Sequence, residues 1–286
     1  MSKSFSSIKA DQYDNGTVMI VDALNLGFRW KHSGATEFLD EYVRTVDSLR
    51  KSYRAKHVVI ACDQGSSSYR KALHPGYKGA RKEKFELQTE AERVQFELFF
   101  KEFNRVVEYF RDNTNFSVFR FDKTEADDIA AYIVRNYKTY GFNKVWLMSS
   151  DKDWDLLVQD NVSRFSYVTR KEITADNWSN HYDCTQEEYI SLKCLQGDSG
   201  DSVPGVPGVG PTRANQLITK YGSALDIAGL LPIEGTAKYI QNLNEFGEAG
   251  IMLNYQLMDL LTYCDEAIGP ANCKIIDEVM SNVTND

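Results

Sequence analysis

Acidic side chains recur at the ends of four short runs of β-forming residues. The runs are Thr17 to Val21, Lys56 to Cys62, Phe116 to Phe121 and Asn143 to Met148. Each is followed, at once or within a few residues, by acids: Asp22, then Asp63, then Glu125 with Asp127 and Asp128, then Asp151 with Asp153. The carboxyl ends of parallel strands meet at one edge of a sheet, where α/β proteins place their sites. We therefore expect these seven carboxylates to converge.

The chemistry that suits such a cluster is metal-dependent. Like charges at close range repel strongly unless a cation neutralises them. The chain has no Cys-x-x-Cys pair and no close pair of histidines, so the ligands must be oxygens, which favour Mg²⁺ or Mn²⁺. Two such ions ~3.5–4 Å apart cleave phosphodiesters by making hydroxide available and by stabilising charge on the phosphate and leaving oxygen. Asp198 and Asp201, in the segment GDSGDS, are two further candidate ligands.

Taken singly, these acids have ordinary structural explanations. The acids from Glu125 to Asp128 could cap a helix and complement its dipole, and Asp198 and Asp201 could be turn residues. The same feature at four strand ends is not explained in this way, so the joint occurrence favours a metal site. Asp155 has no assigned role: it completes the opening of an EF-hand pattern that the rest of the segment does not continue.

Residues 69 to 84 form the densest positive stretch of the chain, with six Lys or Arg against a single acid. A solvated face is the plain interpretation of such a run. An aromatic ring between cations also suits base stacking beside phosphate contacts. On that interpretation the DNA-binding residues of the run are Arg70, Tyr77, Lys78, Arg81 and Lys82. The next segment repeats apolar residues every three or four positions from Phe96 to Phe110, which predicts a helix that packs in the core or in an arch.

A glycine-rich and proline-rich turn, VPGVPGVGP, separates two predicted helices, Tyr189 to Gln196 and Pro211 to Tyr221. It could be an ordinary helix–helix turn. Its open backbone could also hold a DNA phosphate, or a monovalent cation beside one, without reading sequence. The candidate DNA contacts here are Gly205, Gly208, Gly210 and Arg213.

Alternation of strands and helical patterns over the first two-thirds predicts an α/β fold with a parallel sheet, and helical patterns predominate from about residue 186. The net charge of −8 ordinarily counts against a nucleic-acid partner. Without the nine predicted ligands, however, the acids fall from 41 to 32, against 33 basic residues. No apolar stretch is long enough to span a membrane, and residues 1 to 16 lack the apolar block of a secretory signal. We therefore expect a cytoplasmic protein.

Seven segments in order resemble the 5′-nuclease family, the flap endonucleases and polymerase-associated 5′-to-3′ exonucleases. They are VDALNL, ACDQG, YKGAR, EADD, SSDKDWD, GDSGDS and VPGVPGVG, over about residues 17 to 260. Within the family the chain is most similar to the phage T5 type, through MSKS at the start, VSRFS after the DWD motif, and KYIQNLN. The pattern departs from the family at Ser202, where Asn is common, and at Thr212-Arg213, where Lys-Thr is common, so Arg213 is expected to replace that lysine.

The resemblance implies a PIN-like α/β nuclease core at residues 17–185 with a helical arch at about 75–111. A helical region at 186–286 would follow, with a helix-three-turn-helix motif at about 189–221 that grips duplex DNA with K⁺. It also implies a structure-specific flap endonuclease and 5′-to-3′ exonuclease of replication and repair. Two Mg²⁺ ions, or Mn²⁺ in their place, would be bound by Asp22, Asp63, Glu125, Asp127, Asp128, Asp151, Asp153, Asp198 and Asp201.

The same resemblance assigns the remaining roles. Lys78 and Arg81 would contact the scissile phosphate and act in catalysis with Asp153 and Asp201. The implied partners are branched or 5′-flap DNA and a replication polymerase or single-strand DNA-binding protein, with a monomeric enzyme in the host cytoplasm. Two other functions remain open: a phosphatase in which Asp151 is the nucleophile, and a branched-DNA-binding protein without activity.

Overall fold

The computed structural model describes residues 16–283, apart from the side chain of Lys82. The N-terminal residues that argued against a secretory signal, and the MSKS segment, lie outside the described part except for Gly16. The chain divides into two compact units. The sheet unit comprises the residues up to Ser66, Gln88–Ala175 and the residues from Cys264 onward, and the helical unit comprises Ser67–Leu87 and Asp176–Tyr263.

The sheet unit is built on six strands in the order β3-β2-β1-β4-β5-β6. Their bounds are β1 Thr17–Asp22, β2 His57–Cys62, β3 Ser117–Arg120, β4 Lys144–Met148, β5 Val162–Ser166 and β6 Lys171–Ile173. The first five run parallel, and β6 pairs antiparallel with β5 at the edge. The four predicted strands and the α/β class are confirmed. Strands β5 and β6 were not predicted as strands, and β6 makes the sheet mixed.

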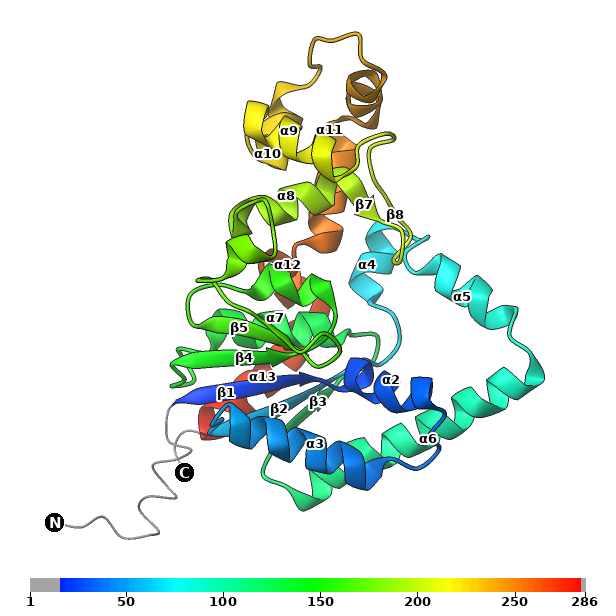
Figure 1. Ribbon diagram of the computed structural model, residues 1–286, viewed down its shortest axis with the longest axis vertical. Coiled ribbons are helices and arrows are strands. Elements are labelled where there is room, and N and C mark those ends of the chain that lie inside the picture. Colours follow the sequence, from blue (N-terminus) through cyan, green and yellow to red (C-terminus); the bar gives the residue numbers. More distant parts are fainter. Residues whose placement is uncertain (1–15, 284–286) are drawn as a thin grey trace, which may run out of the picture. The chain divides into compact units, whose positions relative to one another are not determined.

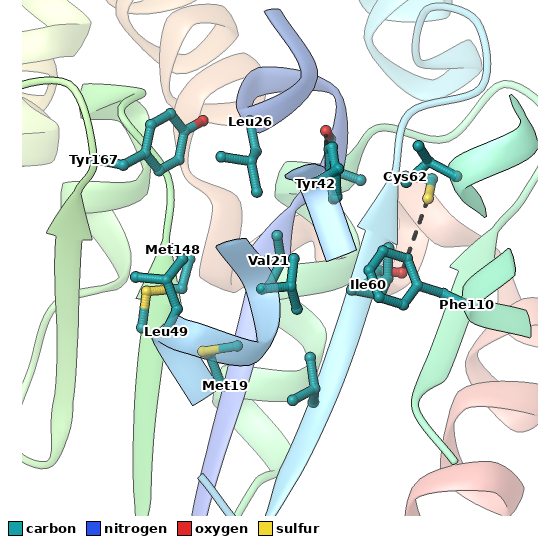
Figure 2. Packing of buried hydrophobic residues seen from close by; sticks show 14 of the residues in the cluster. Met19, Val21, Leu26, Tyr42, Leu49, Ile60, Cys62, Phe110, Met148 and Tyr167 are labelled. Atoms are coloured by element: carbon teal, nitrogen blue, oxygen red, sulfur yellow. Dashed lines mark hydrogen bonds between the residues drawn. The ribbon is translucent and has the colours of Figure 1, made fainter. Parts of the chain in front are cut away.

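Helices cover both faces of this sheet. Helices α2 Ala23–Ser33, α3 Leu39–Ser52 and α6 Glu90–Asn113 lie on one face, and α7 Ala126–Asn136 and α13 Pro270–Val283 lie on the other (Figure 1). Successive strand side chains point to opposite faces. Met19, Val21 and Ile60 accordingly pack with Tyr42 of α3 and Phe110 of α6 in one buried cluster (Figure 2). The periodic apolar stripe on α6 is therefore core packing along most of its length.

The helical unit contains eight helical segments within its described residues. They are α4 Ser68–Leu73, α5 Gly79–Glu86, the 3₁₀ helix η2 Trp178–Asn180, α8 Gln186–Gln196, α9 Pro211–Tyr221, α10 Ala224–Leu230, α11 Lys238–Met258 and the start of α12 Leu260–Ile268, whose remainder belongs to the sheet unit. The predicted helix–turn–helix is present as α8 and α9, joined by a short antiparallel ladder of β7 Gly197–Asp198 and β8 Val203–Pro204. A Cβ on Gly205 would lie 1.9 Å from the carbonyl oxygen of Gln196, so this ladder requires glycine.

The two compact units do not follow a single cut along the chain. Residues 67–87 belong with the helical unit, and the C-terminal residues from Cys264 belong with the sheet unit. The segment predicted as an arch, 75–111, is largely helical as α5 and α6, which fall on either side of the division. The domain boundary at 185/186 and the arch remain predictions. Among the described residues, no helix is long and apolar enough to cross a membrane.

Candidate active site

Asp22 is the last residue of β1 and the N-cap of α2, and its side chain is buried. Both of its carboxylate oxygens accept hydrogen bonds. The backbone N–H of Asn25 donates to Oδ1 at 3.2 Å, as expected at a helix N-cap, and the hydroxyl of Ser149 donates to Oδ2 at 2.6 Å. The carboxylate at the end of the central strand is therefore held in one orientation.

The start of α7 brings three more acids to the same edge of the sheet, and Asp63 after β2 adds a fourth. Glu125 is the N-cap of α7 and Asp127 and Asp128 lie in its first turn, with Glu125 and Asp128 buried. Asp63, directly after β2, accepts a hydrogen bond at Oδ1 from the N–H of Ala126 at 3.2 Å. The acid that follows β2 is thus hydrogen-bonded to the backbone of the turn that carries the acids after β3.

The acids after β4 lie at the start of the 3₁₀ helix η1, Lys152–Leu157. Asp151 caps this helix by accepting the N–H of Asp153 at 3.0 Å. Trp154 of η1 donates from Nε1 to Oδ1 of Asp127 at 2.6 Å, which links η1 to α7. Asp155, for which the sequence suggested no role, is buried and forms a bidentate ion pair with Arg164 of β5, at 2.5 and 2.7 Å.

The pKa of Asp22 reflects its burial and the acids that surround it. Burial raises the pKa of Asp22 well above its ordinary value, and the charges of Asp63 and Asp151 raise it further against the opposing hydrogen bond from Ser149. A divalent cation among these carboxylates would relieve both effects, and their oxygens are the donors that Mg²⁺ and Mn²⁺ prefer. The residues present therefore fit such an ion.

In their present rotamers these acids do not yet form a ligand group. Within residues 16–283, no three Asp, Glu, His or Cys side chains are arranged so that they could hold a metal ion.

Asp198 and Asp201, the other two predicted ligands, lie in the helical unit, Asp198 at the end of β7 and Asp201 in the turn between β7 and β8. Asp198 accepts the N–H groups of Gly200 and Asp201 at 2.8 and 3.3 Å, and the ammonium group of Lys193 lies 3.5 Å from its Oδ2. These contacts are those of a turn-forming aspartate. The metal role of Asp198 stays a prediction.

Asp201 is the centre of a basic cluster formed with the predicted catalytic residues. Arg81 donates from Nη2 to its Oδ1 at 2.5 Å, and Tyr77 donates its hydroxyl to Oδ2 at 2.9 Å. The ammonium group of Lys78 lies 3.8 Å from Oδ2, and the Lys78 backbone N–H donates to the Asp201 carbonyl at 2.8 Å. Lys78 and Arg81 are thus gathered around one carboxylate.

Two other residues of the basic run have structural contacts in place of an exposed surface. Arg70 is buried and donates from Nε to the Leu257 carbonyl at 2.8 Å, which anchors α4 to the end of α11. The ring of Tyr77 is also buried, in the core of the helical unit, and cannot present a face for base stacking as it stands. We therefore do not include either side chain among the proposed DNA contacts. The side chain of Lys82 lies outside the described part of the chain.

The glycine-rich turn before α9 is fixed by two side chains that donate to its carbonyl groups. Arg213 donates from Nη1 to Gly208 at 2.6 Å, and Asn242 donates to Pro207 at 2.7 Å. Gly208 has φ of 83°, which side chains rarely adopt, and Gly210 is the N-cap of α9. The exposed N-terminus of α9 therefore offers backbone N–H groups to an anion.

Two family models divide the chain between them. The model described as "5′-3′ exonuclease, N-terminal resolvase-like domain" matches residues 17–183, and that described as "5′-3′ exonuclease, C-terminal SAM fold" matches residues 184–278. The chain belongs to the 5′-3′ exonuclease family.

Individual relatives agree with this assignment. The flap endonuclease of Escherichia phage T5 is 40% identical over 99% of this chain and 98% of its own length, and the flap endonuclease Xni of Shewanella woodyi is 29% identical over 86% and 93%. Two solved structures of the phage T5 enzyme, one with bound divalent zinc and one complexed with DNA and metal ions, each superimpose with a TM-score of 0.87. Each covers 94% of this chain and 98% of the solved chain.

The site of this 5′-3′ exonuclease also contains residues that sequence reasoning missed. Ser149, Asn25 and Arg164 contact the acids or their neighbours, yet none was singled out within the segments SSDKDWD, VDALNL and VSRFS that contain them. Asn25 accepts the Ser150 N–H at 3.1 Å as well as the hydroxyl of Tyr167. The available signals were their places in those segments and, for Asn25 and Ser149, a position within three residues of a strand end and its acid.

Proposed function

We propose that this chain is a divalent-metal-dependent nuclease that hydrolyses DNA phosphodiesters near 5′ ends and at junctions of single-stranded and duplex DNA. It would thus act as a flap endonuclease and as a 5′-to-3′ exonuclease in replication and repair. The observation that supports this most is the position of the acids at the carboxyl edge of the sheet, where burial and the charges of Asp63 and Asp151 raise the pKa of Asp22. Family membership supplies the reaction for which that charge is suited.

The residues proposed to hold the metal are the acids of the sheet unit, Asp22, Asp63, Glu125, Asp127, Asp128, Asp151 and Asp153. We propose Mg²⁺ as the natural ion, with Mn²⁺ as a substitute, because all donors are hard oxygens. When bound, such ions supply Lewis acidity that activates water and neutralises charge on the phosphate. The assignment of Asp198 and Asp201 to the second ion rests on the sequence resemblance alone.

The basic cluster is proposed to bind DNA phosphate through Lys78 and Arg81. Both side chains are gathered around Asp201. A phosphate would have to replace or share that carboxylate as their partner. Arg81 is 60% exposed and Lys78 is 13% exposed, so Arg81 is the one that an incoming phosphate meets with less rearrangement. Lys78 would become available as the ion pair opens.

The turn before α9 is proposed to hold the backbone of duplex DNA without reading its sequence. Gly205 is required by the close approach to Gln196, while the backbone of Gly208 and Gly210 borders the exposed start of α9. In this structure Arg213 holds the turn, and a phosphate contact by its remaining nitrogens is part of the proposal. A K⁺ ion at this turn is a further proposal from the resemblance.

The wider setting follows from the substrate and the relatives. DNA complexes and divalent metal ions are present in the solved phage relatives. We propose 5′-flap or branched DNA as the partner of this chain. The protein would act as a monomer in the host cytoplasm. A replication polymerase or single-strand DNA-binding protein would deliver the substrate.

One experiment separates the three candidate functions. The protein is incubated with a labelled 5′-flap DNA and, separately, with a small phosphate monoester, each in Mg²⁺ and in EDTA. The proposed function predicts cutting of the flap in Mg²⁺ alone and no release of phosphate from the monoester. Monoester hydrolysis would favour an aspartyl phosphatase with Asp151 as nucleophile. Tight flap binding with no cutting in any metal would indicate a DNA-binding protein without activity.

A further inference from the structure

Ser149 connects the carboxylate of Asp22 to the backbone of Asp151 through a single hydroxyl group. It follows β4 directly and is completely buried. Its hydroxyl donates to Asp22 Oδ2 at 2.6 Å and accepts the backbone N–H of Asp151 at 3.0 Å. The end of β1 and the turn after β4 therefore share one hydrogen-bonding group.

The backbone of Ser149 is itself held by a buried ion pair. Its carbonyl oxygen accepts Nη1 of Arg164 at 2.9 Å. The other nitrogens of that guanidinium, Nε and Nη2, donate to the two oxygens of Asp155. The exposed fractions of the Arg164 and Asp155 side chains are 4% and 0%, so the pair is removed from solvent. A planar guanidinium with five donors suits this task, since it can bind a carboxylate bidentately and still reach a carbonyl.

Stability alone does not account for such a pair. Desolvation of two charges offsets most of their attraction, and apolar residues of similar volume are often as stabilising. The pair instead fixes the position of the Ser149 backbone. The Ser149 hydroxyl, which orients the Asp22 carboxylate, is fixed with it. Groups that orient metal ligands alter metal affinity, typically by 10- to 100-fold when they are removed.

We propose that Ser149 is a positioning residue for the metal carboxylates and that the Arg164–Asp155 pair holds it in place. The hydroxyl orients the Asp22 carboxylate and fixes the backbone at the start of η1, where Asp151 and Asp153 lie. None of the three positioning side chains touches DNA or a reacting atom in this account. The inference rests on the proposed metal-dependent function and identifies the residues that hold its metal ligands in position.

The test measures metal-linked stability in place of activity. The free energy of unfolding is obtained by urea titration in EDTA and in a fixed excess of Mg²⁺, for the wild type, Ser149→Ala and Ser117→Ala. Ser117 is the matched control because it is a buried serine of the same sheet whose hydroxyl pairs with His57, at the start of β3. Binding to the native state alone stabilises in proportion to the logarithm of metal concentration over Kd.

We expect the Ser149→Ala protein to bind Mg²⁺ at least about tenfold more weakly than the wild type. The stabilisation by Mg²⁺ then falls by ~1.4 kcal/mol or more at a saturating concentration. Ser117→Ala should keep the wild-type increment, whatever its stability in EDTA. A Ser149→Ala protein that is weaker in EDTA but keeps the full increment would overturn the inference and leave the proposed function intact. A wild type with no increment would contradict the proposed metal site and the inference with it.

A double substitution, Arg164→Met with Asp155→Leu, tests the second layer while avoiding an unpaired buried charge. We expect it to lose metal affinity in the same direction as Ser149→Ala, because the Ser149 carbonyl loses its donor. Isothermal titration with Mg²⁺ provides the readout. A folded double variant with wild-type affinity would remove the ion pair from the proposal.

Discussion

Asp153 lies in the first turn of η1, where its backbone is fixed by Asp151 while its side chain remains partly exposed. Asp153→Asn keeps the shape of the side chain but removes the charge that a divalent ion requires. We predict loss of flap cleavage by roughly 10³-fold or more with little change in flap affinity measured in EDTA. Single-turnover cleavage and equilibrium binding check the two halves of the prediction.

The control for this substitution is Asp160→Asn, an exposed acid beyond η1 that belongs to no predicted ligand set. Its cleavage rate should match the wild type. Equal losses of binding and cleavage in Asp153→Asn would show that Asp153 supports the fold and not the chemistry.

Lys78 tests the role of the basic cluster at the level of one charge. If its ammonium group stabilises charge that develops on the phosphate, the effect appears mainly in the transition state. We predict that Lys78→Ala lowers the single-turnover rate by roughly 10²-fold and changes flap affinity much less, since other phosphate contacts remain. Lys71→Ala, an exposed lysine of α4, is the matched control. A Lys78→Ala rate within about threefold of wild type would leave Lys78 as a partner of Asp201 only.

His57 gives a prediction about stability and pH. Burial, together with the charges of Arg50 and Lys56, lowers the pKa of His57 to about 4, and its ring pairs with the Ser117 hydroxyl at 2.8 Å. Between this value and the ordinary pKa of 6.5, the unfolded chain binds a proton that the folded chain does not. Stability should therefore fall as pH falls through this window, by about 2 kcal/mol from pH 7 to 5.

Urea unfolding of the wild type and His57→Gln at several pH values measures this contribution. The difference in unfolding free energy between the two proteins should change across the window by the amount above. A difference that stays constant from pH 7 to 5 would mean that burial does not lower the pKa of His57.

Residue types were visible in the sequence, but their environments were not. Acids after strands could be identified because their position relative to a β-rich run is a local property. The burial of Arg70 and of the Tyr77 ring depends on contacts with α11 and with the core of the helical unit, which no local pattern encodes. Ser149 is a common residue type in an unremarkable position, so its three contacts could be found only in three dimensions.

At the scale of elements, the ladder between α8 and α9 depends on the close approach of two backbones. Gly205→Ala would place a Cβ 1.9 Å from the Gln196 carbonyl oxygen, so the backbone must move. We predict that the free energy of unfolding falls by ~1–3 kcal/mol, the usual cost of overpacking. Flap binding should also weaken, because the turn before α9 shifts. Thermal unfolding and flap binding measure both effects.

Gly210→Ala is the matched control in the same turn. A Cβ there meets nothing within 4 Å, and its φ of −95° suits any residue. Its stability should stay within about 0.5 kcal/mol of wild type, and flap binding should persist, since the N–H group is retained. Equal defects in both variants would indicate a role for the glycine backbone other than the close approach at Gly205.

Most elements could be predicted from pattern, and the failures have physical causes. The strands β1, β2 and β4 are mostly apolar runs, which is the pattern of buried parallel strands, whereas β3 (SVFR) alternates buried and half-buried residues. Strand β5 escaped prediction as a strand because Arg164 stands in the middle of a five-residue run, and its charge is satisfied only by Asp155. Strand β6 has three residues, two of them charged and exposed, as edge strands often are.

At the scale of the whole molecule, the chain returns to the sheet unit after the helical unit. Helix α13 packs beside α7, where Asp277 accepts hydroxyl groups from Tyr132 at 2.9 Å and from Tyr140 at 2.5 Å. A linear division at 185/186 does not anticipate this return, because it requires long-range contacts that sequence periodicity does not report. The helix that carries Asp127 and Asp128 is thereby supported by the C-terminal part of the chain.

Net charge is the other property that belongs to the whole molecule. The chain carries −8 overall, yet seven of its 41 acids follow strand ends, while the basic run and the turn before α9 are nearly free of acids. Total charge would therefore mislead about DNA binding. The distribution of charge along the chain predicts it.

Cleavage near 5′ ends is tested by mapping the cuts on two DNAs of the same sequence, one with a 5′ flap and one with a 3′ flap. Each carries a label at its free flap end and is incubated with the protein in Mg²⁺ and in EDTA. The proposed function predicts cutting of the 5′ flap near its junction with the duplex, in Mg²⁺ alone, and little or no cutting of the 3′ flap. Equal cutting of both flaps, or cutting that persists in EDTA, would contradict it.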